Sequence, residues 1–195
     1  MLDQLLIELG GLHFVDYSGL IFGILYVFFA TKERAICWIF GGISSLSIAY
    51  AGFVLYKLYS DGILNIIYFL FAIWGLKNWL GGQANNPVSV SRMDRRAHLY
   101  YILISLCAAI PMAVLFSLFT EASLPWLDAL TTSFALGATI LTIQKKLENW
   151  IYWIIIDLVY IGVYYSQGAY LFAILFVVYV ILAVQGFISW KRSYS

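Results

Sequence analysis

The chain has 195 residues, of which 63% are hydrophobic and 11% are charged, and its mean hydropathy is +0.89. This composition excludes a soluble globular protein and is typical of integral membrane proteins. The net charge of +1 gives no basic or acidic bias that would indicate a nucleic-acid partner. The first residues carry Asp3 and Glu8 and no basic region or small-residue cleavage site, so they do not predict a cleaved signal.

Seven apolar segments are long enough to cross a bilayer, and polar breaks separate them. The one long break, at residues 81–97, is rich in turn-forming residues and follows the third segment. We therefore predict an all-α integral membrane protein. The predicted spans are Phe14–Thr31, Ala35–Tyr56, Asp61–Leu80, His98–Phe119, Leu127–Ile143, Leu147–Tyr165 and Gly168–Trp190.

The positive charges lie almost entirely on one side of the predicted spans. Of the 11 Lys and Arg residues, Lys57 alone falls on the side of the N-terminus. The positive-inside rule makes the opposite side cytoplasmic, so we expect the N-terminus outside and the C-terminus inside. The residues on the cytoplasmic side are Lys32, Arg34, Lys77, Arg92, Arg95, Arg96, Lys145, Lys146, Lys191 and Arg192.

The first three and last three spans resemble each other when the sequence is shifted by 112 residues, or by 111 toward the end. We predict a 3+1+3 plan, with parallel repeats at residues 1–82 and 123–195 and a linker and central helix at residues 83–122. The central span is needed to give both repeats the same orientation. The matching pairs are Asp16 and Asp128, Trp38 and Trp150, Ser45 and Asp157, Tyr68 and Tyr179, Ala72 and Ala183, Gly75 and Gly186, and Trp79 and Trp190.

A carboxylate, Asp157, lies near the middle of the sixth span, where a charged residue costs roughly 2.5–3.5 kcal/mol. No Lys, Arg or His falls at this depth to neutralise it. Helical spacing places Asp157 on one face with aromatic residues. We therefore predict a flat cationic ligand between the repeats, held by aromatic walls and this charge. The predicted substrate-binding residues are Trp38, Ser45, Asn65, Tyr68, Trp150, Trp153, Asp157, Tyr160 and Tyr164.

Other features favour no catalytic or cofactor site. The sequence has no phosphate-binding loop and no metal-ligand cluster, and Cys37 and Cys107 sit in apolar segments as packing residues. Asp16 and Asp128 either cap helices or take part in gating. Two further hypotheses stay open. One is a membrane scaffold or receptor subunit whose stripes are packing surfaces, and the other is a passive channel.

Several motifs together resemble the PnuC family of bacterial vitamin transporters. They are ENWxxWxxxD at Glu148 to Asp157, GxxxW near both repeat ends, NIIYFLFAIWGLKNW, and PWLDALTTSFALGATILTIQKKLENW. The resemblance implies SWEET-like triple-helix units, a homotrimer, and a place in the bacterial inner membrane. It also implies facilitated diffusion of a small vitamin without ion or ATP coupling, made one-way by a cytoplasmic vitamin kinase.

The family's best-known substrate is nicotinamide riboside, but two positions depart from its pattern. Asp157 replaces an Asn of the sixth-helix motif, and Asn65 replaces a Gln of the third helix. Both positions are expected to contact the substrate. Nicotinamide riboside and thiamine are both flat cations, and Asp157 would complement the charge of either. Thiamine lacks a ribose, so the loss of an amide partner for the sugar affects it less, and the two replacements together favour thiamine. Family membership alone places the riboside first. Riboflavin, with its neutral ring, ranks third.

Overall fold

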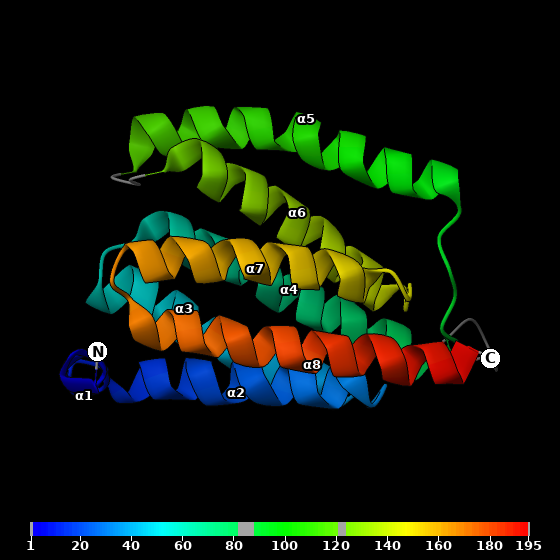
Figure 1. The fold of residues 1–195 in the computed structure, drawn as a ribbon, viewed down its shortest axis with the longest axis horizontal. Coiled ribbons are helices and arrows are strands. Elements are labelled where there is room, and N and C mark those ends of the chain that lie inside the picture. Colours follow the sequence, from blue (N-terminus) through cyan, green and yellow to red (C-terminus); the bar gives the residue numbers. More distant parts are fainter. Residues whose placement is uncertain (1, 82–87, 121–123, 195) are drawn as a thin grey trace.

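The computed structural model describes residues 2–81, 88–120 and 124–194. Within these ranges the chain forms eight α-helices and one π-helical turn (Figure 1). They are α1 (Leu2–Gly10), α2 (Phe14–Thr31), α3 (Cys37–Tyr50), η1 (Ala51–Leu55), α4 (Tyr59–Gly81), α5 (Arg95–Phe119), α6 (Pro125–Ile143), α7 (Asn149–Ser166) and α8 (Tyr170–Tyr194).

Six of the described helical segments are long and apolar enough to cross a membrane. They are α2, α3 with η1, α4, α5, α6 and α8. The helix α7 is not among these six, although it runs alongside α8 (Figure 1) and, with 18 residues, is as long as α2. Its Asp157 and its many Tyr and Trp residues lower its hydropathy. The predicted spans agree with the observed helices to within a few residues, and α2 has the predicted bounds.

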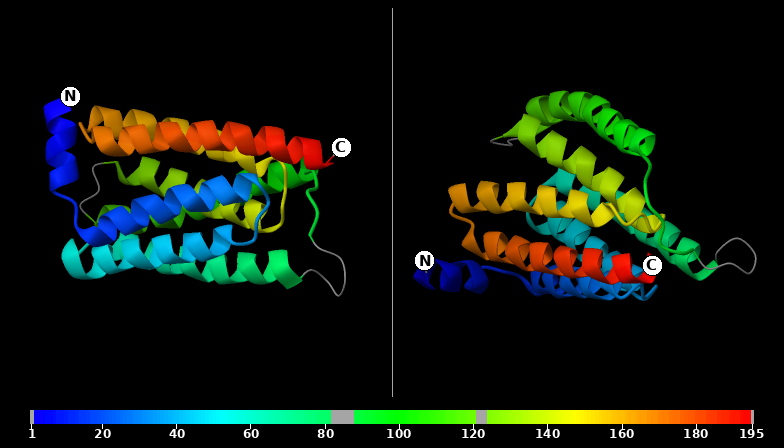
Figure 2. Two further views of the ribbon diagram at one scale, coloured as in Figure 1. Left: turned by 90° about the horizontal axis from the view of Figure 1, so that it is seen from below. Right: turned by 45° about the vertical axis from the view of Figure 1, so that its right-hand side comes forward.

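The long helices pack as two groups that meet through α2 with α8 and through α4 with α6. In the first group α3 packs against both α2 and α4, and in the second α7 packs against both α6 and α8. The helix α5 lies at the edge of the molecule and packs mainly on α6 (Figures 1 and 2). Its outer face is rich in exposed apolar side chains, as expected for a surface in contact with lipid.

The turns that follow α2 and α6 have the same backbone hydrogen bonds. The amide of Glu33 donates to the carbonyl of Ala30 (3.0 Å), and the amide of Lys145 donates to that of Thr142 (3.0 Å). Glu33 and Lys145 both have left-handed backbones, with φ of 54° and 52°. Their side chains form an ion pair of 3.1 Å, which joins the two turns directly. The two groups of helices are therefore linked at this end of the molecule.

Four tryptophans lie just inside these turns. Trp38 meets Trp79 edge to face, with ring centroids 5.4 Å apart, and Trp150 meets Trp190 in the same way at 5.3 Å. Trp79 and Trp190 contact each other at 5.9 Å. Because Trp190 is fully buried and Trp79 is 7% exposed, both are core residues and not anchors in the membrane interface.

Hydrogen bonds from these tryptophans cross between the two groups of helices. The indole of Trp79 on α4 donates to the carbonyl of Ile143 at the end of α6 (3.0 Å). The indole of Trp190 on α8 donates to the carbonyl of Ala30 near the end of α2 (3.0 Å). The Nζ of Lys145 also lies 4.7 Å from the centroid of a Trp79 ring. This end of the molecule is therefore closed by reciprocal contacts between the groups.

The segment before α5 is attached to the turn between α6 and α7. Ser91 forms a parallel bridge there, accepting from the amide of Leu147 (2.9 Å) and donating to the carbonyl of Lys145 (3.0 Å). The buried carboxylate of Glu148 then accepts from Arg92 Nε (3.1 Å) and from the amide of Met93 (2.9 Å). The predicted linker at residues 81–97 thus includes an anchored part, while residues 82–87 lie outside the described ranges.

The sequence did not predict α1, which lies across the opposite end of the bundle (Figure 2, left). Its Glu8 carboxylate accepts from the amides of Tyr170 (3.2 Å) and Leu171 (2.8 Å), so it caps the start of α8. Of the two cysteines, Cys37 is buried as predicted, whereas Cys107 is exposed on the outer helix α5.

Candidate binding cavity

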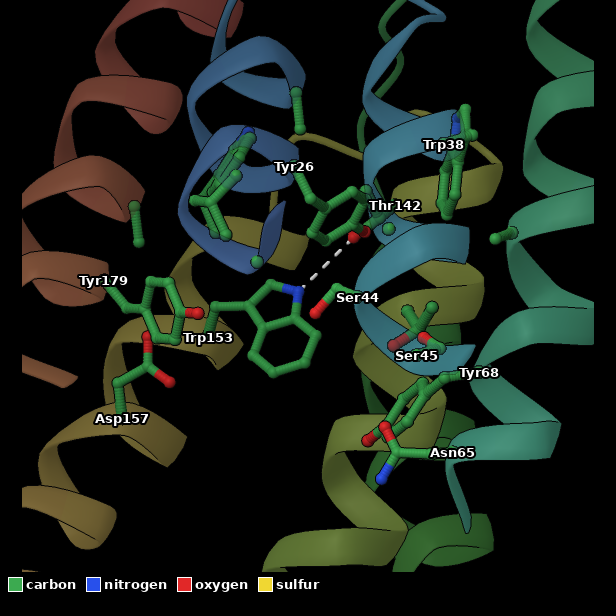
Figure 3. Close-up of a pocket in the computed structure, with 18 of the residues that line it drawn as sticks. Tyr26, Trp38, Ser44, Ser45, Asn65, Tyr68, Thr142, Trp153, Asp157 and Tyr179 are labelled. Atoms are coloured by element: carbon green, nitrogen blue, oxygen red, sulfur yellow. Dashed lines mark hydrogen bonds between the residues drawn. The ribbon is translucent and has the colours of Figure 1, made fainter. Parts of the chain in front are cut away.

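A cavity of about 210 Å³ lies between the two groups of helices, with walls from α2, α3, α4, α6, α7 and α8. Most of its wall is apolar or aromatic, and none of the described residues that line it is Lys, Arg or His. Figure 3 shows Trp153 and Asp157 from α7 on one side, Tyr68 and Asn65 from α4 on the other, and Ser44 and Ser45 between them.

The structure brings seven of the nine predicted site residues to this cavity. They are Trp38, Ser45, Asn65, Tyr68, Trp150, Trp153 and Asp157. These residues come from helices distant in sequence, so their convergence is a property of the fold. The hypothesis of a packing scaffold required Asp157 and Asn65 to bond to neighbouring helices with no cavity between them. Asn65 donates instead to the carbonyl of Asp61 in its own helix (2.9 Å), and both residues line the cavity, so the scaffold hypothesis is not supported.

The other two predicted residues, Tyr160 and Tyr164, are not among the residues that line the cavity. They stack against Phe176 of α8, with ring centroids 4.8 Å and 5.4 Å from it. Phe176 itself lines the cavity, so the two tyrosines support the wall from behind. Tyr160 and Tyr164 lie about one and two turns beyond Asp157 on the same face of α7, where their rings meet Phe176.

Asp157 is 4% exposed and lines the cavity, and it forms no hydrogen bond or ion pair with any described residue. Trp153 precedes it by one helical turn on the same face of α7. Figure 3 shows the carboxyl group beside the ring of Tyr179 from α8. A buried acid without a partner is costly, so this group suits a ligand that brings positive charge or hydrogen-bond donors.

Four hydroxyl groups at the cavity wall also make no hydrogen bond with the described residues. They belong to Tyr26, Ser45, Tyr68 and Tyr179, three of which are tyrosines from different helices. Most buried polar groups in proteins have a partner. Several free hydroxyls around one cavity therefore favour a ligand that itself carries several polar groups.

The indole of Trp153 is held in place by a buried network. Its Nε1 donates to Thr142 Oγ1 (3.3 Å), drawn as the dashed line in Figure 3. The hydroxyl of Thr142 donates to the carbonyl of Ala138 (2.9 Å) or to Asn149 Oδ1 (3.1 Å), and Asn149 Nδ2 donates to the carbonyl of Lys146 (2.6 Å). The network connects the cavity wall to the turn between α6 and α7.

Sequence reasoning missed the other residues that line the cavity, and five of these carry hydroxyl groups: Tyr26, Ser44, Thr139, Thr142 and Tyr179. Tyr179 was the counterpart of Tyr68 in the sequence comparison, so that pairing could have identified it. Tyr26 occupies space left by Gly41, where a Cβ atom would lie 3.0 Å from the Tyr26 ring. A tyrosine in a tyrosine-rich span gives no such signal in the sequence.

The carboxylates of Asp16 and Asp128, near the starts of α2 and α6, differ in their hydrogen-bond partners. Asp16 accepts from the amide of His13 (2.8 Å) and from the Tyr56 hydroxyl (2.5 Å), so it caps α2 and holds the end of η1. Asp128 makes no hydrogen bond or ion pair with any described residue. Asp16 therefore caps α2 through hydrogen bonds, whereas Asp128 lies in the first turn of α6, where the helix dipole favours a carboxylate. Among the described residues, no group of three His, Cys, Asp or Glu side chains could hold a metal ion.

Comparison with known proteins gives three findings. Residues 13–192 match the family described as nicotinamide mononucleotide transporter. A protein of Neisseria mucosa named nicotinamide riboside transporter PnuC is 26% identical over 87% of this chain and 69% of its own length. The protein of that name from Escherichia coli K12 is 22% identical over 93% of this chain and 87% of its own length.

A solved structure, the crystal structure of the vitamin B3 transporter PnuC, has a similar fold. Its TM-score is 0.75 with 23% sequence identity, and the match covers 97% of this chain and 86% of that one. At this identity the likeness concerns the fold and not the ligand.

Proposed function

Because the chain belongs to the PnuC family of membrane transporters, whose profile it matches over residues 13–192, we propose that it carries nicotinamide riboside across the membrane by facilitated diffusion. The observation that carries this proposal is the unpaired Asp157 carboxyl group in an aromatic cavity without a basic residue. Nicotinamide riboside has a flat pyridinium ring with a permanent positive charge. Trp153 and its aromatic neighbours suit the ring, and Asp157 suits the charge.

The cavity favours the riboside over its phosphorylated form. A phosphate group carries negative charge and is normally bound by Arg, Lys or backbone amides at a helix start. No described residue that lines the cavity is basic, and Asp157 adds a carboxyl group. A mononucleotide would therefore place its phosphate near a like charge without any compensating partner.

The free hydroxyls distinguish between the two cationic vitamins. Ser45, Tyr26, Tyr68 and Tyr179 have no partner among the described residues, and a ribose offers three hydroxyls and a ring oxygen to them. Thiamine offers one hydroxyl, one amino group and two pyrimidine nitrogens, which is fewer polar groups than the riboside has with its carboxamide included, so it would leave more of these hydroxyls unpaired, at a cost for each. Asp157 favours both cations equally, whereas the hydroxyls support the riboside.

The charge of the ring gives a direct test, because the reduced form of nicotinamide riboside has nearly the same shape and no charge. The purified protein should bind the cation more tightly than the reduced form. Asp157→Asn should weaken binding of the cation by about tenfold or more while changing binding of the reduced form by less than about threefold. Calorimetry with both forms and with thiamine measures this difference. Equal affinity of the Asn variant and the wild type for the cation would contradict the role of Asp157.

The same proposal includes seven membrane-crossing helices in a 3+1+3 arrangement. The helix α5 is the fourth crossing, between the two repeats in the sequence, and α7 also crosses the membrane. The matching turns after α2 and α6 support it, as do the matching contacts of Trp38 with Trp79 and of Trp150 with Trp190. The distribution of Lys and Arg supports an N-terminus outside and a C-terminus in the cytoplasm. Attaching a reporter to either terminus and testing its access from each side would check this orientation.

Two further parts of the proposal rest on the family resemblance. They are assembly as a homotrimer and dependence on a cytoplasmic kinase that traps the vitamin. The mass of the detergent-solubilised complex tests the first. Uptake in cells that lack the kinase tests the second, since a passive carrier should then reach equilibrium without net accumulation.

A further inference from the structure

The network that holds Trp153 exists in only one of the two matching helix groups. In the second group it consists of Trp153, Thr142 and Asn149, with Thr142 2% exposed and Asn149 fully buried. The residues found 112 positions earlier are Gly41, Ala30 and Cys37. All three polar or aromatic members are therefore replaced at once by small side chains that cannot form the same bonds.

The first group builds the same turn without this network. The amide of Cys37 donates to the carbonyl of Arg34 (2.9 Å), as the amide of Asn149 donates to that of Lys146 (3.1 Å). Cys37 and Ala30 are as deeply buried as their counterparts. The network is therefore not needed to close the turn or to pack the helices around it.

What differs between the groups is the aromatic side chain presented to the cavity. In the first group Tyr26 fills the space beside Gly41, and in the second the large indole of Trp153 extends into the wall itself. An indole on a single helix has two rotatable side-chain bonds, so an N–H bond to a fixed acceptor selects one orientation. Thr142 Oγ1 is that acceptor, and Asn149 in turn restrains Thr142.

We infer that Thr142 and Asn149 are positioning residues that fix the indole of Trp153 as the stacking wall for the flat ring of the ligand. This inference rests on the proposed function. Asn149, the middle residue of the ENW segment (residues 148–150), would then have a role at the cavity in addition to the contacts of this segment at the turn. The affinity for the ligand should depend on the hydroxyl oxygen of Thr142, which accepts the bond from the indole, and should depend little on the methyl group of Thr142.

The test uses Thr142→Val, which removes the hydroxyl and keeps the shape, and Thr142→Ser, which keeps the hydroxyl. Nicotinamide riboside should bind about tenfold more weakly to the Val variant and within about 1.5-fold of wild type to the Ser variant. Thr31→Val is the matched control, because Thr31 is a buried threonine at the end of α2 that does not line the cavity. Its hydroxyl bonds to its own helix (2.7 Å), so this variant should bind as wild type does.

A double-mutant cycle with Trp153→Phe separates positioning from direct contact. Phenylalanine has no N–H, so Thr142→Val should then change the affinity by less than about twofold. A tenfold loss in both backgrounds would overturn the inference, because Thr142 would then act without Trp153. A folded Thr142→Val variant with wild-type affinity would overturn it as well.

A second measurement needs no ligand. In protein labelled with ¹⁵N-tryptophan, the indole N–H signal of Trp153, assigned by its loss in Trp153→Phe, should shift in Thr142→Val and stay in place in Thr31→Val. An unchanged signal overturns the inference even if the wild type binds no riboside, an outcome that would refute the proposed function separately.

If Thr142→Val does not fold, Asn149→Cys replaces it in the test. This variant copies the residue of the first group and should weaken binding by about threefold; unchanged binding would overturn the inference.

Discussion

Glycine residues Gly75 and Gly186 allow the tryptophan pairs to form. A Cβ atom at Gly75 would lie 2.3 Å from Trp38 Cε2, and one at Gly186 would lie 2.6 Å from Trp150 Cε2. These distances are far below normal contact, and the neighbours are rigid rings. The close approach of helices through small residues is typical of membrane proteins.

We therefore expect Gly75→Ala to destabilise the protein by about 1–3 kcal/mol through overpacking against Trp38. Gly162→Ala on α7 is the control, because nothing lies within 4 Å of the position of its Cβ atom. A helical Gly→Ala change in open space should be neutral or stabilising, by up to about 1 kcal/mol. Thermal unfolding in detergent measures both. Equal melting temperatures for the two variants would contradict the steric explanation.

Tyr56 lies outside the candidate membrane spans, and its environment predicts a pH dependence. The hydrogen bond from its hydroxyl to Asp16, together with some burial, raises the pKa of Tyr56 to about 12. The unfolded value is about 10, so the folded state holds this proton more tightly. The resulting stabilisation is complete below pH 10 and is lost as the pH rises toward 12. Melting curves of Tyr56→Phe and wild type should differ at pH 8 and converge near pH 12; a difference that stayed constant would exclude this cause.

At the scale of single residues, the sequence predicted seven residues of the cavity wall and missed several others that carry hydroxyl groups. Asp157 was identifiable because an acid in a membrane span is an anomaly whatever surrounds it. Thr142 and Tyr26 are ordinary residues in their helices, and their roles depend on what packs opposite them. Tyr160 and Tyr164 share the stripe of Asp157, but their rings lie against Phe176 of α8 and are not among the side chains that line the cavity.

At the scale of elements, α1 is attached through the start of α8. Glu8 accepts two backbone amide bonds there, and Gln4 Nε2 donates to the carbonyl of Gly168 (3.1 Å). Glu8→Ala should cost about 0.5–2 kcal/mol, the range for the loss of a helix cap, and should make α1 more accessible to protease. Glu8→Gln keeps an acceptor oxygen and should therefore reduce the stability less than Glu8→Ala does. A wild-type cleavage rate in Glu8→Ala would show that other contacts hold α1.

The helices themselves were predictable because apolar length sets the spans, and α2 matches its predicted bounds. The helix α1 was missed because it is short and its order depends on contacts with α8, which no local pattern reveals. The sequence predicted a linker at residues 81–97 and gave no indication that part of it is anchored. The anchoring of Ser91 and Arg92 on the α6–α7 turn depends on Glu148, which is distant in sequence.

At the scale of the whole molecule, the cavity is closed on the side of the Glu33–Lys145 pair. Cys37 is fully buried beneath it, in one core cluster with the four tryptophans. Opening of this side should expose the Cys37 thiol, so its labelling rate reports how often the closure breaks. In a Cys107→Ser background, Glu33→Gln or Lys145→Gln should speed labelling of Cys37 by about fivefold, the effect of roughly 1 kcal/mol.

The effects of Glu33→Gln and Lys145→Gln on the labelling rate of Cys37 should not be additive. Once one partner of the ion pair is gone, removing the other has little further effect, so the double variant should be labelled at nearly the rate of either single one. Lys32→Gln is a control, because Lys32 lies in the same turn and its Nζ is 3.9 Å from the Phe28 ring and not in the pair. Strictly multiplicative rates in the double variant would mean that the two residues act independently.

Glu33 and Lys145 occupy left-handed positions after a helix end, where glycine is usually favoured. At these two positions the unfavourable left-handed backbone is combined with two opposite charges, whose side chains are 22% and 10% exposed. Partly exposed ion pairs weaken as dissolved salt screens them, over a distance of about 8 Å at physiological ionic strength. The contacts that close this end should therefore break more often as the salt concentration on that side of the membrane rises.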